Sequence, residues 1–113
     1  MTTIYHNAQC SKSRESLALL KLKKEEILVI DYLHDVPKRS ELRRIIKILK
    51  IKPFDLIRTN EKLFQEKFAQ LDAKTTNWVK IMVENPRLIE RPIVIKDGRA
   101  VIGRPTEKVL SIL

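Results

Sequence analysis

The chain has 113 residues, of which 43% are hydrophobic and 33% are charged. This length and balance predict a single folded domain with a buried core and exclude an intrinsically disordered chain. No apolar run approaches the roughly 20 residues that a membrane-spanning helix needs, so we expect no contact with a membrane. The amino-terminal residues lack the pattern of a secretory signal, and the single cysteine, Cys10, cannot form an internal disulfide. Both features favour a cytoplasmic location.

The chain is strongly basic, with 23 basic and 14 acidic residues and a formal charge of +9. Much of the excess lies in residues 21–24 and 38–52. Aromatic residues make up only 5% and are not interleaved with the cations, so stacking on single-stranded bases is not favoured. We expect these cations to form solvated helix faces and nucleic acid not to be a partner. A nucleic-acid binder whose affinity falls steeply with salt is the alternative that this charge leaves open.

The amino-terminal third predicts a strand, a helix and a strand. Residues 2–5 are a short β-rich run, and residues 11–23 have a helical pattern with Leu17, Leu20 and Leu22 available to face inward. The uninterrupted apolar run at residues 27–30 is typical of a strand buried on both faces. Because a β-α-β unit of these lengths places its strands side by side in one direction, we expect a parallel pair.

The middle of the chain predicts helices. Their apolar faces are marked by Leu42, Ile45, Ile46 and Leu49, then by Leu63, Phe64 and Phe68, and then by Trp78, Val79, Met82 and Val83. Pro53 can open a short helical turn between the first two. We expect Thr59 or Asn60 to cap the second helix and a cap near Thr75 for the third, which ends before Pro86.

The carboxyl-terminal segment predicts a β-hairpin and a final helix. Residues 93–96 and 99–102 are β-rich and flank Asp97-Gly98, a dipeptide that a two-residue primed turn favours. Gly103 breaks the second strand, and Pro105 can start a helix with Val109, Leu110 and Leu113 on one side. The order β-α-β, helical middle, β-β-α predicts an α/β fold with a mixed four-stranded sheet.

Cys10 lies where the first predicted strand has ended and the first helix begins. The free backbone N–H groups and the dipole at a helix start favour an anion there, either a thiolate or a bound oxyanion. Lys12 and Arg14 add positive charge, and the Ser13 hydroxyl can donate to sulfur. A lone cysteine is often only a small buried apolar residue, but these polar neighbours favour a reactive thiol. Because Ser13 occupies the second cysteine position of a C-x-x-C pattern, an oxidised Cys10 must be resolved by an outside thiol.

Three arginines, Arg58, Arg91 and Arg104, lie at the ends of predicted elements, the last two beside prolines. Guanidinium groups bind tetrahedral oxyanions through paired hydrogen bonds and keep their charge. Each arginine alone is equally compatible with a surface position. His6, at the end of the first strand, is compatible with a hydrogen-bonded structural role or with a charge-donating one.

Four motifs resemble the glutaredoxin-linked arsenate reductase family, particularly its short arsenate reductase-like branch. They are H-N-x-x-C-S-K-S-R at residues 6–14, L-I-R-T-N-E at 56–61, I-E-R-P-I-V at 89–94 and D-G-R-A-V-I-G-R-P at 97–105. The match extends over nearly the whole chain and keeps the motifs in order. It implies a thioredoxin-like fold over residues 1–113, with a helical insertion at approximately residues 38–86.

The resemblance also implies a site and a reaction. Cys10 would be the nucleophile, Arg58, Arg91 and Arg104 would bind the oxyanion, and His6, Ser13 and a cis Pro92 would assist. The implied activity is reduction of arsenate to arsenite through a Cys10 adduct, with glutathione and glutaredoxin as external reductants. No metal or bound cofactor is expected, and we expect a monomer.

Alternative functions and one departure from the family pattern accompany this expectation. A related branch of the fold resembles redox-sensing transcriptional regulators that bind RNA polymerase; Ser13 argues against it, because that switch needs a second cysteine. A thiol oxidoreductase acting on another substrate is the other alternative. The family usually has proline where this chain has Ala8, so the approach to the thiol is expected to be less rigid.

Overall fold

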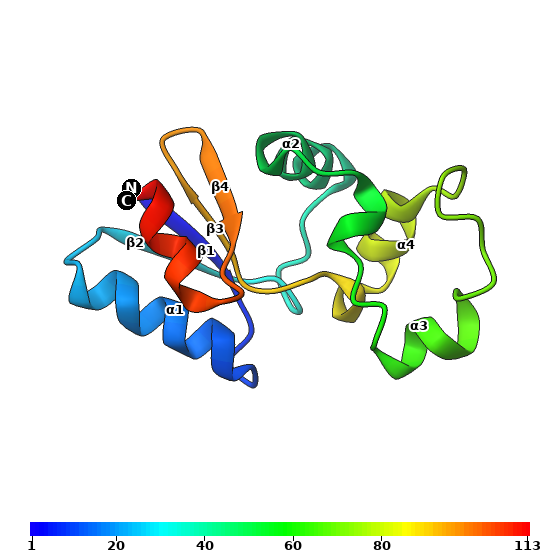
Figure 1. The fold of residues 1–113 in the computed structure, drawn as a ribbon, viewed down its shortest axis with the longest axis horizontal. Coiled ribbons are helices and arrows are strands. Elements are labelled where there is room, and N and C mark those ends of the chain that lie inside the picture. Colours follow the sequence, from blue (N-terminus) through cyan, green and yellow to red (C-terminus); the bar gives the residue numbers. More distant parts are fainter. The chain divides into compact units, whose positions relative to one another are not determined.

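The computed structural model describes residues 1–113. The chain forms two compact units (Figure 1). The sheet unit consists of Met1–Asp35 and Arg91–Leu113, and the helical unit is Val36–Glu90. None of the helices combines the length and the apolar character that crossing a lipid bilayer requires.

The sheet unit holds a mixed four-stranded sheet in the order β2-β1-β3-β4. Its elements are β1 (Thr2–His6), α1 (Ser11–Leu22), β2 (Ile27–Asp31), β3 (Ile93–Lys96), β4 (Arg99–Ile102) and the 3-10 helix η3 (Thr106–Ile112). β1 and β2 are parallel, whereas β3 is antiparallel to both β1 and β4. The predicted α/β class, β-α-β unit and hairpin are therefore confirmed.

The β3–β4 hairpin places the residues before β3 next to the residues after β4. Asp97 and Gly98 have φ angles of 50° and 74°, the positive values that a two-residue primed turn requires. Ile93 at the start of β3 pairs with Ile102 at the end of β4. Beyond that pair the Gly103 N–H donates to the Pro92 carbonyl at 2.9 Å. The residues that flank this bond, Arg91 and Arg104, therefore leave the sheet at the same place.

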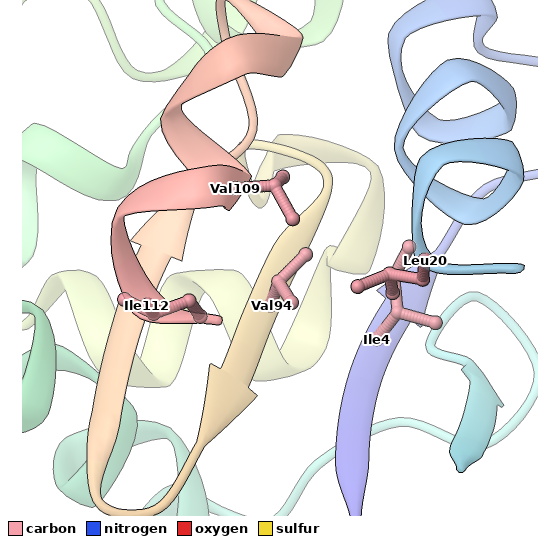
Figure 2. Close-up of a cluster of buried hydrophobic side chains, with 5 residues drawn as sticks. All are labelled: Ile4, Leu20, Val94, Val109 and Ile112. Atoms are coloured by element: carbon pink, nitrogen blue, oxygen red, sulfur yellow. The ribbon is translucent and has the colours of Figure 1, made fainter. Parts of the chain in front are cut away.

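One apolar cluster holds α1 and η3 against the sheet. Ile4 of β1 and Val94 of β3 are register partners, and Leu20 of α1 packs on them with Val109 and Ile112 of η3 (Figure 2). All five side chains are buried. α1 and η3 therefore cover the same face of the sheet, and this packing sets where the first turn of α1 lies.

Three sequence-based expectations about burial are wrong. β2 is an edge strand, not a strand buried on both faces, and its Leu28 and Val29 are each 46% exposed. Leu22 is 75% exposed, because the inward positions of α1 are Ser13, Ser16 and Leu20. The final helix has 3-10 geometry, so Val109 and Ile112 share its buried side and Leu110 is exposed.

The helical unit contains α2 (Arg39–Leu49), η1 (Pro53–Leu56), α3 (Lys62–Lys67), α4 (Trp78–Glu84) and η2 (Pro86–Leu88). α2 buries Leu42, Ile45 and Ile46, as its amphipathic pattern predicts. The predicted cap of α3 is wrong, because this helix begins after Glu61. The cap of α4 lies near Thr75, as predicted: it is Asn77, whose side chain accepts a hydrogen bond from the Lys80 N–H at 3.1 Å. Asn77 takes this role because it directly precedes the first helical residue.

We predict that Leu20→Ala and Leu22→Ala have very different effects on stability, although both truncate a leucine on α1. Leu20 is fully buried in the apolar cluster, so its truncation should lower the free energy of unfolding by about 2–5 kcal/mol. Leu22→Ala should change it by no more than about 0.5 kcal/mol. Urea denaturation followed by circular dichroism measures both, and equal losses would contradict the burial pattern of α1.

Candidate active site

Cys10 is the N-cap residue of α1, in the short connection that follows β1. Its side chain is 8% exposed. The sulfur forms no capping hydrogen bond, but the backbone N–H groups of Lys12 and Ser13, in the first turn of the helix, favour its charged form. Because these groups have no partner inside a helix, the helix start can stabilise an anion at this position.

Two arginines from the far end of the chain approach the same sulfur. The Arg104 Nη1 donates to Cys10 Sγ at 3.6 Å and to the Arg91 carbonyl at 3.3 Å. The charge of the Arg91 guanidinium also acts on the thiol. Arg91–Pro92 is a cis peptide bond, as the resemblance implies. Arg104–Pro105 is cis as well, which the sequence analysis did not anticipate, although its X-Pro pattern permits it.

The pKa of Cys10 is lowered from its ordinary value. Burial is the largest single influence and raises the pKa, because it disfavours the charged form. The Ser13 N–H, the charge of Arg91, the Lys12 N–H and the hydrogen bond from Arg104 lower it and together outweigh burial. The site therefore favours a thiolate, which is the nucleophilic form of cysteine.

Partly buried His6 and fully buried Ser13 form a hydrogen-bonded pair between β1 and α1. The Ser13 hydroxyl accepts a hydrogen bond from the Asn7 N–H at 2.9 Å and lies 2.6 Å from His6 Nδ1. Since Ser13 is fully buried, its own proton has His6 Nδ1 as its acceptor. Burial lowers the pKa of His6; the charge of Asp31 opposes this, and Lys21 and Arg14 add to it. Of the two roles left open for His6, the geometry favours that of a neutral hydrogen-bonded residue.

The loop that carries Cys10 is closed by hydrogen bonds that the sequence analysis missed. Asn7 accepts the Cys10 N–H through its backbone carbonyl at 3.0 Å and the Gln9 N–H through its side chain at 2.9 Å. Arg14, expected only to add charge, donates to the Ala8 carbonyl at 2.8 Å. An asparagine directly after a strand is a turn-forming signal that could have identified the first of these contacts.

Gly103 permits a close approach beside the site. A Cβ atom at this position would lie 2.6 Å from Ser16 Oγ and 3.0 Å from Pro92 Cγ. Real Cβ atoms almost never come that near to other heavy atoms, so only glycine fits between α1 and Pro92. Because Gly103 has no side chain, the backbone can pass close to α1 here, and the next residue, Arg104, reaches Cys10.

Six of the seven predicted site residues belong to the sheet unit: Cys10, Arg91, Arg104, His6, Ser13 and Pro92. The seventh, Arg58, belongs to the helical unit. Its guanidinium forms an ion pair with Glu61 at 3.1 Å and donates to the Arg87 carbonyl at 3.1 Å. Its role towards an oxyanion therefore stays a prediction. No group of three or more histidine, cysteine, aspartate or glutamate side chains is arranged to hold a metal ion.

Comparison with known proteins places this geometry in a family. The sequence profile of the ArsC family matches residues 5–112. The chain is 44% identical to the uncharacterized protein YfgD of Escherichia coli K12, over 97% of this chain and 94% of the relative. It is 43% identical to an arsenate reductase of Haemophilus influenzae, over 97% of each chain.

A solved structure agrees with the sequence relatives. The arsenate reductase from Vibrio cholerae superposes with a TM-score of 0.89 at 42% identity, covering 99% of this chain and 97% of that one. The match therefore includes the segment that carries Cys10 and the hairpin that carries Arg91 and Arg104. The chain belongs to the ArsC family and has its thioredoxin-like fold.

Proposed function

We propose that this protein is an arsenate reductase in which Cys10 is the nucleophile. The observation that carries the proposal is the contact between Cys10 Sγ, at the start of α1, and the Arg104 guanidinium at 3.6 Å. A sulfur held as an anion beside a fixed cation is suited to attack a bound oxyanion. Relatives that are 43% and 42% identical carry the name arsenate reductase, which supports this choice of oxyanion.

Arg91 and Arg104 are the proposed oxyanion ligands within the sheet unit. Both carry permanent charge, and guanidinium groups bind tetrahedral oxyanions through paired hydrogen bonds. The resemblance adds Arg58 as a third ligand. Pro92 holds the chain direction after Arg91, while His6 and Ser13 act as positioning residues that fix the loop before Cys10.

The proposed reaction transfers two electrons to arsenic. The Cys10 thiolate attacks arsenate, an oxygen leaves as water after protonation, and a Cys10–S–As(V) bond forms. The glutathione sulfur then displaces a second oxygen from arsenic, and this oxygen also leaves as water after protonation. A glutaredoxin thiol attacks that sulfur, so that the two external thiols become a mixed disulfide and As(V) becomes As(III). Hydrolysis of the remaining Cys10–S–As bond releases arsenite and regenerates the thiol.

The single cysteine supports an external source of electrons. Reduction by two electrons through disulfide formation needs two thiols, and Cys10 is the only one in the chain, so at least one must come from another molecule. Glutathione and glutaredoxin are the proposed donors, in the reducing environment of the cytoplasm. The proposal needs neither a metal nor a bound organic cofactor, and one chain supplies Cys10, Arg91 and Arg104.

The first test measures arsenate-dependent oxidation of NADPH in the presence of glutathione, glutaredoxin and glutathione reductase. The wild-type protein should turn over, whereas Cys10→Ser should fall to the rate without protein, because a hydroxyl at this position is not ionised near neutral pH. Wild-type turnover no faster than Cys10→Ser would reject arsenate reduction. Turnover with thioredoxin and thioredoxin reductase but not with glutaredoxin would reject only the proposed electron donors.

The second test measures the rate of Cys10 alkylation by iodoacetamide against pH. The wild-type thiol should titrate below an ordinary cysteine. Arg104→Gln should raise the pKa of Cys10, because it removes the guanidinium that donates to sulfur, and so slow alkylation at neutral pH. It should also lower kcat/KM for arsenate about 100-fold, as loss of one oxyanion donor does in other enzymes.

Lys108→Gln is the matched control for Arg104→Gln. It removes one positive charge from the same unit at an exposed position outside the site. An identical slowing of alkylation in both variants would show that net charge, and not the contact with Arg104, controls the thiol.

A third test concerns the state of His6. Nitrogen-15 NMR should show neutral His6 with its proton on Nε2 near pH 7, because Nδ1 accepts from Ser13. Since burial lowers the pKa of His6, the midpoint of its protonation should lie below pH 6.5, the ordinary value. The unfolded chain binds this proton more readily than the folded one, so stability should fall as pH drops through that range. A proton on His6 Nδ1 near pH 7 would contradict the assignment.

A further inference from the structure

The helical unit contains a cavity of about 520 Å³ that the proposed reaction does not use. It lies between η1 and the residues that precede α4, and its walls include Lys52, Phe54, Asp55, Lys74, Thr76 and Trp78. All of these residues belong to Val36–Glu90. The volume is within the range of about 300–1,000 Å³ that is typical of small-molecule sites.

The cavity has a rigid aromatic wall. The ring centroid of Trp78 lies 5.1 Å from that of Phe54 and 6.0 Å from that of Phe64. Trp78 is nearly fully buried, whereas Phe54 is only partly buried. Phe54 therefore offers the accessible apolar surface on which a planar ring can stack, and Trp78 packs against Phe54.

The polar side of the cavity is also ordered. Trp78 Nε1 donates to the Ala73 carbonyl at 2.9 Å, and the Lys74 N–H donates to Asp72 Oδ1 at 2.7 Å. The Thr76 N–H donates to the Asp72 carbonyl at 3.2 Å. The bond from Trp78 to Ala73 ties the segment that carries Lys74 and Thr76 to the aromatic wall. Both residues line the same cavity as Trp78.

The charge of the lining favours an anion. Lys52 and Lys74 each bring one positive charge, and neither side chain forms an ion pair. Asp55 brings the one negative charge, and its Oδ2 already accepts the Lys52 N–H at 3.1 Å. A cation could contact the aromatic faces, but two lysines would repel it. A carboxylate or phosphate would gain from both.

We propose that this cavity binds a small planar aromatic anion, whose ring stacks on Phe54 beside the edge of Trp78 and whose charged group lies towards Lys52 and Lys74. The site is separate from the thiol chemistry and does not depend on it, because no lining residue belongs to the sheet unit. Its ligand is defined by a flat apolar body joined to an anionic group, which can be a carboxylate or a phosphate.

The test uses the fluorescence of Trp78, the only tryptophan in the chain. Benzoate and phenyl phosphate are the anionic probes, and benzylamine is a cationic probe of similar size. A saturable change with one or both anions, and none with benzylamine, is expected. A response to only one anion identifies the charged group that the site accepts. No saturable response to either anion, or an equal response to benzylamine, would overturn the proposal.

Matched variants locate the binding. Lys74→Gln should weaken the binding of the anion at least about 5-fold, whereas Lys80→Gln, an exposed lysine on α4 outside the cavity, should leave it within about 2-fold. Both lysines are exposed, so neither variant should disturb the fold. Equal weakening in the two variants would show that general positive charge attracts the probe and would also overturn the proposal.

Discussion

The reactivity of Cys10 requires a negative charge on a sulfur that is nearly buried. Burial alone raises the pKa of Cys10 and would leave a neutral, weakly reactive thiol. The opposing contributions come from N–H groups of the first turn of α1 and from two arginines about 80 and 94 residues further along the chain. The thiolate therefore exists only when the helix start and the open end of the hairpin are both in place. Folding and reactivity are linked through this one atom.

The connection before Cys10 is held in place by hydrogen bonds. The family resemblance indicates a proline at position 8, which would restrict the backbone through its ring. Here Ala8 stands at that position, and the Arg14 guanidinium binds its carbonyl at 2.8 Å. Asn7 accepts N–H groups from Gln9 and Cys10 and donates its own to Ser13. A side chain from the first helix thus supplies a restraint in place of a ring.

The fold was predictable where local signals were decisive. Asp97-Gly98 specifies a tight hairpin by itself, and the spacing of strand, helix and strand specifies the parallel pair. Burial was less predictable, because it depends on neighbours that local sequence does not reveal. An apolar run such as residues 27–30 is equally compatible with a central strand and with an edge strand, and here β2 is at the edge. Leu110 was misplaced for a similar reason, since the 3-10 geometry of η3 changes which residues share a face.

The part of the site that could be predicted from local sequence is the thiol at the start of α1. The polar surroundings of Cys10 and its place before a helix indicated an anion. The contact with Arg104 spans 94 residues; the place of Arg104 at the end of a predicted element was compatible with it, and the family resemblance implied it. Ser13 shows what sequence could not reveal. Its position suggested a missing second cysteine, yet its hydroxyl is engaged by the Asn7 N–H and by His6. A residue engaged in this way holds the loop before Cys10 in position, and under the proposed function the reducing equivalents enter from another molecule.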